Sequence, residues 1–130
     1  MGKEVDETGQ FVLGSRYVIE DKNGNVKARF VAKGNEERGD PRSDSPTASK
    51  DYFKTFLALA ANEGYQIKNL DVTTAFLQGY PLDREVCIKP PPEKAKPVKS
   101  METQKAWYGL YDASRRWYMA VRETLLSMGI

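Results

Sequence analysis

Asp71 is the residue whose type and position are best suited to chemistry. Residues 65–72 alternate in the manner of a β-strand, which would place Asp71 near the end of that strand. A carboxylate between apolar neighbours is costly to bury unless it binds a cation or accepts hydrogen bonds. Together with the backbone carbonyl of Val72, it could hold a divalent metal against a triphosphate. From spacing alone, the favoured alternative is that Asp71 caps a short helical turn beginning at Thr73.

Composition restricts any metal chemistry to oxygen ligands. The sequence contains no histidine, which excludes a Ser-His-Asp triad and a His-ligated zinc site within it. The single Cys87 cannot form an internal disulfide or a thiolate cluster, and we expect it to pack in a strand as a small apolar residue. Asp and Glu remain, and their oxygens suit Mg²⁺ or Mn²⁺.

A basic β-hairpin is the second candidate. Residues 16–19 and 26–31 read as strands joined by an Asn-Gly turn, a pair that adopts positive φ at little cost. Its cations could lie over a phosphate chain: Lys22, Lys27, Arg29 and Lys33. The guanidinium of Arg29 suits bidentate contact with a phosphate. Exposed hairpins also carry alternating charges that discourage edge pairing, and this alternative stays open.

The third candidate, residues 107–118, combines aromatic and basic residues. Asp112 can cap a final helix, whereas Arg115 and Arg116 lie near its N-terminus, where the helix dipole disfavours cations. Their position suggests an anionic partner, although solvation at the surface would explain it nearly as well. The basic excess over residues 94–122 is compatible with a surface that faces a polyanion. Its alternative is a solvated linker beside a helix whose aromatic residues belong to the core.

Two helices are predicted to support these candidates. Ser49 can cap a helix that runs to about Asn62, with Gly64 beyond its end. Its apolar residues follow helical spacing, so we expect one stripe to pack on a sheet: Phe53, Phe56, Leu57 and Ala60. The second helix is predicted over about residues 114–128.

The rest of the chain is predicted to contain one further strand and several irregular segments. Residues 1–14 are polar and should be loosely ordered, and residues 81–85 read as a turn. Residues 85–89 alternate as a strand that is stopped by three prolines. The lysine- and proline-rich residues 93–103 indicate a mobile connector. The resulting order, β-β-α-β-β-α, indicates an α+β domain rather than a doubly wound sheet.

Length and polarity indicate one polar domain. A chain of 130 residues can bury a modest core, and charged residues make up 29% of it, with a mean hydropathy of −0.62. No apolar run approaches the roughly 18 residues needed to span a membrane. The N-terminus lacks the apolar core of a signal peptide. We therefore expect an intracellular protein, in the cytoplasm or nucleus, that is not secreted and has no membrane partner.

Taken together, the motifs resemble the reverse transcriptase of copia-type LTR retrotransposons. The residues that carry the resemblance are 27–34, 45–47, 57–61, 70–79, 108–110 and 113–118. The resemblance implies the N-terminal fingers and palm portion of a right-hand polymerase, with an antiparallel sheet and helices packed on one face. Residues 15–48 would form the fingers hairpin and residues 49–130 the palm.

The resemblance also implies roles for particular residues around a metal and a sugar. Asp71 would be the first metal-binding aspartate, and Val72 would lend its carbonyl to the same ion. The ion would be Mg²⁺ or Mn²⁺. Phe76 would lie under the incoming sugar as a steric gate against a 2′-hydroxyl.

Further roles concern the triphosphate and the template. Arg29 would grip the triphosphate, with Lys22 or Lys27 as its lysine companion. Tyr108 would belong to a segment that lines the pocket near the template and the incoming nucleotide. The implied partners are an RNA or DNA primer-template, a deoxynucleoside triphosphate and the remaining part of the polymerase.

Departures from the family pattern argue against activity in isolation. The 130 residues contain no Tyr-x-Asp-Asp motif, which supplies two more metal carboxylates in the family. Tyr111 stands where related sequences usually have lysine, and residues 100–106 are more polar than the apolar strand expected there. Asp83 and Glu85 could substitute only if residues 81–85 were not a turn. We therefore expect an inactive polymerase portion. The alternative is a domesticated, non-catalytic module that binds nucleic acid or protein, or associates with itself through an exposed sheet edge.

Overall fold

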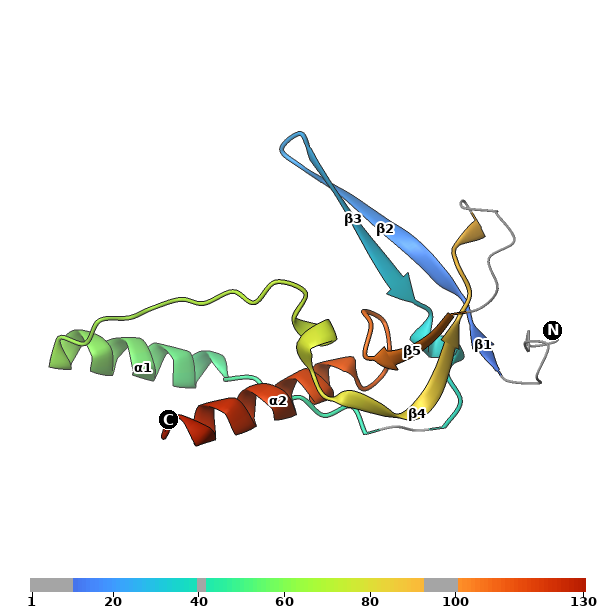
Figure 1. Cartoon of the computed structure of the whole chain (residues 1–130). Helices are drawn as coiled ribbons and strands as arrows, with labels where there is room; N and C mark the ends of the chain where they lie inside the picture. Colours follow the sequence, from blue (N-terminus) through green and yellow to red (C-terminus); the bar gives the residue numbers. More distant parts are fainter. Residues whose placement is uncertain (1–10, 40–41, 93–100) are drawn as a thin grey trace.

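The computed structural model describes residues 11–39, 42–92 and 101–130, and it confirms an α+β fold (Figure 1). A three-stranded sheet has the order β1-β4-β5, and β2 pairs with β3 in a separate hairpin. The strands are β1 (Val12–Leu13), β2 (Ser15–Lys22), β3 (Asn25–Ala32), β4 (Pro81–Ile88) and β5 (Met101–Lys105). The helices are α1 (Lys50–Glu63) and α2 (Ala113–Ser127), with short 3₁₀ turns η1 (Gly34–Glu36) and η2 (Ala75–Gln78).

The predicted antiparallel sheet is wrong in one pairing, because β1 runs parallel to β4. Val12 lies opposite Cys87 and Leu13 opposite Ile88, whereas β4 and β5 are antiparallel. Both residues of β1 are buried. The expectation that the first 14 residues are loosely ordered is therefore wrong for β1, while residues 1–10 lie outside the described ranges. Cys87 is buried in its strand as expected.

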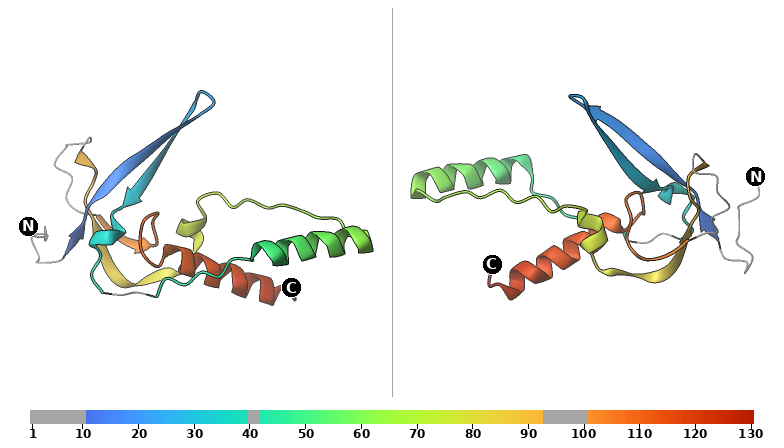
Figure 2. Two further views of the ribbon diagram at one scale, coloured as in Figure 1. Left: turned by 180° about the vertical axis from the view of Figure 1, so that it is seen from behind. Right: turned by 45° about the horizontal axis from the view of Figure 1, so that its top comes forward.

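The hairpin forms as its sequence predicts. Asn23 and Gly24 adopt φ values of 56° and 82° at the turn, and the Gly24 N–H donates to the Asp21 carboxylate at 2.9 Å. The paired strands run from the Ser15–Ala32 pair at the base to the Lys22–Asn25 pair near the turn. In each view of Figures 1 and 2 the hairpin stands out from the rest of the molecule.

Two segments predicted to be irregular are strands instead. Residues 81–85, expected as a turn, begin β4, and the ladder is irregular between Pro81 and Val86. Met101–Lys105 forms β5, so the expectation of a mobile connector is wrong for residues 101–103. Its remainder, residues 93–100, lies outside the described ranges. Pairing with β4 satisfies the backbone of β5 although its side chains are mostly polar and exposed.

A small core joins the hairpin base, the sheet and the start of α2. Leu13 and Ile88 are its largest fully buried side chains. The Phe30 and Trp107 rings meet edge to face at a centroid distance of 4.9 Å, which connects β3 to the loop before α2. The other buried members of this cluster are Ala32, Val86, Ala106, Leu110 and Ala113.

Helix α1 is capped as predicted but does not pack on a sheet. The Tyr52 N–H donates to the Ser49 hydroxyl at 3.3 Å, and Gly64 ends the helix in the left-handed region with φ 68°. However, Phe53 is 57% exposed and Phe56 52% exposed. Ala60 is buried at 2% exposed, but the rest of the apolar stripe is largely uncovered within the part of the chain that the structure describes.

The strand predicted over residues 65–72 is also absent. These residues have no regular structure and lead from α1 back to η2 (Figure 1). Leu70 is 88% exposed. Alternation of side chains does not suffice for a strand, because the backbone also needs a neighbouring strand to pair with.

In the residues described, neither α1 nor α2 combines the length and apolarity that crossing a bilayer requires.

Candidate functional site

Asp71 lies in the irregular segment before η2 rather than at the end of a strand. Its side chain is exposed, and Thr74, not Asp71, occupies the N-cap position of η2, where no side chain makes a capping hydrogen bond. The capping alternative is therefore wrong. Within the described ranges, no three carboxylates or thiolates come together as a metal-binding group. The Asp71 carboxylate and the Val72 carbonyl are hard oxygen donors of the right chemistry for Mg²⁺ or Mn²⁺, but they are too few to form a site by themselves.

Phe76 and Tyr108 are brought together although they are far apart in the sequence. Their ring centroids are 4.8 Å apart, with an angle of 46° between the ring planes. Phe76 belongs to η2, and Tyr108 belongs to the loop that precedes α2. Both residues are partly exposed, so solvent reaches the aromatic pair.

Close backbone contacts with α2 hold η2 in place. A Cβ atom added at Gly79 would lie 2.9 Å from the Trp117 nitrogen, so only glycine allows this approach. The Tyr80 N–H donates to the Arg116 carbonyl at 3.4 Å, and the Lys105 ammonium donates to the Gly79 carbonyl at 3.2 Å. The orientation of Phe76 therefore depends on the first turn of α2.

The loop that carries Tyr108 is attached to the hairpin base. The Ala32 N–H donates to the Tyr108 carbonyl at 2.8 Å. Gly109 follows with φ 95°, and a Cβ atom there would lie 2.0 Å from the Ala32 carbonyl oxygen. Glycine is required at this position for both its conformation and its lack of a side chain.

Gly109→Ala is accordingly expected to lower the free energy of unfolding by about 2–4 kcal/mol, since a steric clash adds to an unfavourable φ. Urea denaturation of the full chain measures this loss. Gly24→Ala is the matched control, because Gly24 also has a positive φ (82°) but nothing lies within 4 Å of its added Cβ. Equal losses in the two variants would show that the close contact at Gly109 is unimportant.

The predicted phosphate-binding cations are distributed along the hairpin. Arg29 forms an exposed ion pair with Glu20 at 3.0 Å. Lys27 and Lys22 are exposed nearer the turn. Lys22 is seven strand positions from the Ser15–Ala32 pair at the base, which corresponds to about 23 Å. The structure therefore brings Phe76 and Tyr108 together but leaves Lys22 at the opposite end of the hairpin.

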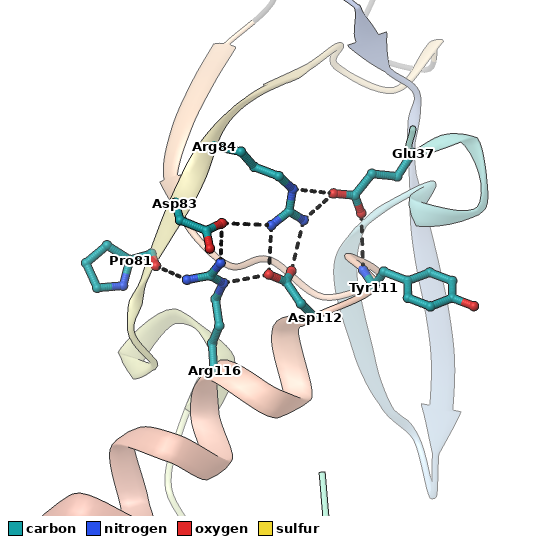
Figure 3. A network of polar contacts seen from close by, with 7 residues as sticks. All are labelled: Glu37, Pro81, Asp83, Arg84, Tyr111, Asp112 and Arg116. Atoms are coloured by element: carbon teal, nitrogen blue, oxygen red, sulfur yellow. Dashed lines mark hydrogen bonds and ion pairs between the residues drawn. The ribbon is translucent and has the colours of Figure 1, made fainter. Parts of the chain in front are cut away.

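A polar network at the start of α2 is the part that sequence patterns do not reveal (Figure 3). The Asp112 carboxylate accepts hydrogen bonds from Arg84 at 2.7 and 2.9 Å and from Arg116 at 2.6 Å. Arg84 also donates to Glu37 at 2.8 Å, and Arg116 donates to Asp83 at 2.5 Å. Only the Asp112–Arg116 pair has a local signal, the i, i+4 spacing on a helix.

The network is charge-assisted, and two of its carboxylates, Glu37 and Asp112, are screened from water. The side chains of Glu37 and Asp112 are 6% and 5% exposed. Burial, the largest single influence, raises the pKa of Asp112, but hydrogen bonds from Arg84 and Arg116 outweigh it and leave that pKa below its ordinary value. Hydrogen bonding to Asp112 likewise raises the pKa of Arg84. Asp112 and Arg84 are therefore charged at neutral pH.

These contacts correct two expectations about the first turn of α2. Asp112 occupies the cap position, but its side chain makes no capping hydrogen bond because both arginines engage it. The anionic partners suggested by Arg115 and Arg116 belong to the chain itself. Arg115 pairs with Asp44 at 2.6 Å.

Comparison with known proteins assigns the sequence to a family. The reverse transcriptase (RNA-dependent DNA polymerase) family matches residues 8–130. The chain belongs to this reverse transcriptase family. It is 36% identical over 132 residues to the Retrovirus-related Pol polyprotein from transposon RE2 of Arabidopsis thaliana, with 91% of the chain covered. It is 32% identical over 128 residues to the Transposon Ty1-ER2 Gag-Pol polyprotein of Saccharomyces cerevisiae, with 95% covered.

The resemblance to copia-type reverse transcriptases is thereby confirmed. The match covers 9% of the RE2 polyprotein and 7% of the Ty1-ER2 polyprotein, so the chain spans less than a tenth of these relatives. No solved structure matches the chain.

Proposed function

We propose that this chain forms the nucleotide-facing part of an RNA-directed DNA polymerase, with the β2–β3 hairpin as the fingers and residues 49–130 as the palm. The observation that carries the proposal is the contact between Phe76 and Tyr108 at 4.8 Å. These two residues were each implicated by the family motifs, and they lie in segments that are far apart in the sequence. A paired aromatic surface suits the sugar and base of an incoming deoxynucleotide.

In this proposal Asp71 and the Val72 carbonyl supply oxygen ligands to a divalent metal. Reverse transcriptases as a family use divalent ions, which neutralise the charge of a bound triphosphate. The exposed position of Asp71 supports the assignment, because the carboxylate is accessible and makes no hydrogen bond within residues 11–39, 42–92 and 101–130. The remaining ligands would come from elsewhere in the polymerase, so the chain alone would not extend a primer.

Arg29 is proposed to bind the triphosphate, with Lys27 as its nearer lysine companion and Lys22 farther out. The exposed Arg29–Glu20 pair supports this role rather than opposing it. Surface ion pairs contribute about 0–1 kcal/mol, so a phosphate can displace Glu20 at little cost.

A domesticated interaction module is the second candidate, and the exposed apolar stripe of α1 favours it. Tyr52 is 77% exposed in addition to Phe53 and Phe56. Such a surface is typical of a site that another protein covers. Primer extension discriminates between the candidates, because a module of this kind would not support nucleotidyl transfer in any polymerase context.

The sugar contact can be tested in a chimera, an RE2-type Pol polyprotein whose matching segment is replaced by this chain. Phe76→Ala is expected to raise ribonucleotide incorporation relative to deoxyribonucleotide by about 10–100-fold, because the space for a 2′-hydroxyl opens. Single-nucleotide primer extension measures the ratio.

Phe56→Ala is the matched control, since Phe56 is an exposed aromatic residue on α1 outside the proposed site. Unchanged discrimination in Phe76→Ala would refute the gate, and an inactive unsubstituted chimera would count against the polymerase assignment itself.

A further inference from the structure

The polar network of Figure 3 connects the two segments that carry the aromatic pair, although neither ring belongs to it. Besides its charged side chains, it includes two backbone groups, the Tyr111 N–H and the Pro81 carbonyl. The first follows Tyr108 in the same loop, and the second follows Phe76 just beyond η2. The charged members of the network are Glu37, Asp83, Arg84, Asp112 and Arg116.

One arm of the network restrains the loop that carries Tyr108. The Arg84 guanidinium donates to one oxygen of the Glu37 carboxylate at 2.8 Å, and the other oxygen accepts the Tyr111 N–H at 3.3 Å. The Glu37 side chain is buried, so these protein partners rather than water set its orientation. Arg84 therefore acts, through Glu37, on the part of the loop that follows Tyr108.

The other arm leads from Arg84 to the first turn of α2. Arg84 donates two hydrogen bonds to the Asp112 carboxylate, at 2.7 and 2.9 Å, and the same carboxylate accepts from Arg116 at 2.6 Å. The Asp112 side chain is buried and that of Arg116 is mostly buried. Because charge-assisted bonds of this kind are short and directional, they hold the Arg116 guanidinium in one orientation.

Arg116 in turn holds the segment that follows η2, the turn that carries Phe76. Its guanidinium donates to the Pro81 carbonyl, and its own carbonyl accepts the Tyr80 N–H at 3.4 Å. Side chain and backbone of one residue therefore bond two consecutive residues directly after this turn. The position of Phe76 depends on Arg116 and, through the shared carboxylate, on Arg84.

An arginine is required at position 84 to serve both arms. Its planar guanidinium presents donors along more than one edge, and here it bonds the carboxylates of Glu37 and Asp112 at the same time. A lysine ammonium has the same charge, but it is a compact group on a flexible stem and lacks this fork. Charge alone would therefore not maintain both arms.

We propose that Arg84 is a positioning residue for the choice between deoxyribonucleotides and ribonucleotides. It acts through its two carboxylate partners to set how closely the Phe76 and Tyr108 rings approach each other. The inference rests on the proposed function and gives the polar network a part in it. Arg84 does not contact the nucleotide; its effect arises because a small displacement of a group that contacts the substrate changes rates strongly.

Arg84→Lys in the RE2-type chimera tests this role. Incorporation of ribonucleotide relative to deoxyribonucleotide is expected to rise by about 3–10-fold, within the range of effects that residues without ligand contact exert on a coupled site. Single-nucleotide primer extension measures the ratio. A merely structural role would reduce the amount of folded enzyme, which lowers both rates equally and leaves the ratio unchanged. An unchanged ratio would therefore overturn the proposal.

Glu37→Gln is a milder second variant that tests the arm toward Tyr108. The amide keeps the size of the carboxylate and an oxygen that can accept the Tyr111 N–H, but it loses the charge that strengthens the bond from Arg84. The incorporation ratio should rise here too, by a smaller factor than in Arg84→Lys. A larger rise would show that Arg84 is not the residue on which both arms depend.

Two controls separate positioning from stability and from general loss of charge. Val12→Ala removes core volume in β1 and leaves every charged group in place, so it should lower stability without changing the ratio. Asp44→Asn breaks an ion pair at the first turn of α2, since Asp44 pairs with Arg115 at 2.6 Å. A rise in either control equal to that in Arg84→Lys would overturn the proposal.

Nuclear magnetic resonance of the full chain gives a readout that does not depend on activity. Rings with centroids 4.8 Å apart should show nuclear Overhauser cross-peaks between Phe76 and Tyr108. These cross-peaks should weaken in Arg84→Lys and persist in Asp44→Asn. Cross-peaks of full intensity in Arg84→Lys would overturn the proposal even if the chimera were inactive.

The two measurements also distinguish this inference from the proposed function. A change of sugar discrimination in Phe76→Ala but not in Arg84→Lys would refute this inference alone. Weakened cross-peaks in Arg84→Lys, combined with unchanged discrimination in Phe76→Ala, would refute the proposed function and the effect on sugar choice. The positioning of the aromatic pair by Arg84 would then stand as a property of the fold.

Discussion

Asp71→Asn is expected to abolish primer extension by the RE2-type chimera while leaving the fold intact. The amide keeps the size of the carboxylate but not its negative charge, so it cannot replace a metal ligand. Asp71 is exposed and makes no hydrogen bond or ion pair within the described residues. Its loss should therefore leave the free energy of unfolding nearly unchanged.

Extension of a labelled primer on a homopolymer template measures the activity, and urea denaturation of the chain measures its stability. Asp51→Asn is the control, because Asp51 is another exposed acid that precedes the candidate site in the sequence. Substantial extension by Asp71→Asn would remove Asp71 from the metal site. A large loss of stability would instead mean that its carboxylate supports the fold.

Asp112→Asn is expected to lower the free energy of unfolding by about 2–4 kcal/mol. Removing one charge from a buried ion pair typically costs about 3–5 kcal/mol, because the partner is left without compensation. The value is smaller here since Arg84 retains Glu37 and Arg116 retains Asp83, and both arginines are partly exposed. Urea denaturation at neutral pH measures the loss. Glu20→Gln, which breaks the exposed pair with Arg29, is the control and should change stability little.

The loss of stability caused by Asp112→Asn should depend on pH in a defined direction. Burial opposes ionisation of Asp112, but the hydrogen bonds from Arg84 and Arg116 prevail, so its pKa is lower in the folded than in the unfolded chain. The unfolded chain then binds more protons in acid. The stabilisation is complete above the unfolded pKa of about 3.9 and is lost as pH falls through the folded pKa. The difference in stability between the original chain and Asp112→Asn should therefore shrink below about pH 4. A constant difference would contradict this role for the carboxylate.

Short-range signals were sufficient for the parts of the fold that depend on neighbouring residues. Ser49 and Gly64 define the ends of α1, and Asn23-Gly24 defines the hairpin turn. The parallel pairing of Val12–Leu13 with β4 could not be predicted in this way, because two apolar residues carry no information about a partner more than seventy positions away. Alternation in residues 65–72 indicates which side chains would share a face of a strand, but not whether a neighbouring strand exists to pair with it.

The candidate site likewise has a part that the sequence predicts and a part that only the fold reveals. Phe76 and Tyr108 follow from family motifs, whereas their spatial contact depends on how η2 lies against α2. Arg84 appears in a segment whose sequence reads as a turn, so its bonds to Glu37 and Asp112 are invisible without the fold. The i, i+4 spacing of Asp112 and Arg116 was available, but capping and dipole arguments suggested other roles for both residues.

The isolation of α1 has a consequence for cooperativity. A helix of 14 residues is close to the length at which an unsupported helix is marginal in water. Its caps contribute only about 1 kcal/mol each, and its apolar side chains contribute little where they remain in solvent. The helix therefore opens as a local unit while the core around Leu13 and Ile88 stays folded. Burial of its stripe by another polypeptide would add to the stability of the helix without acting directly on the core.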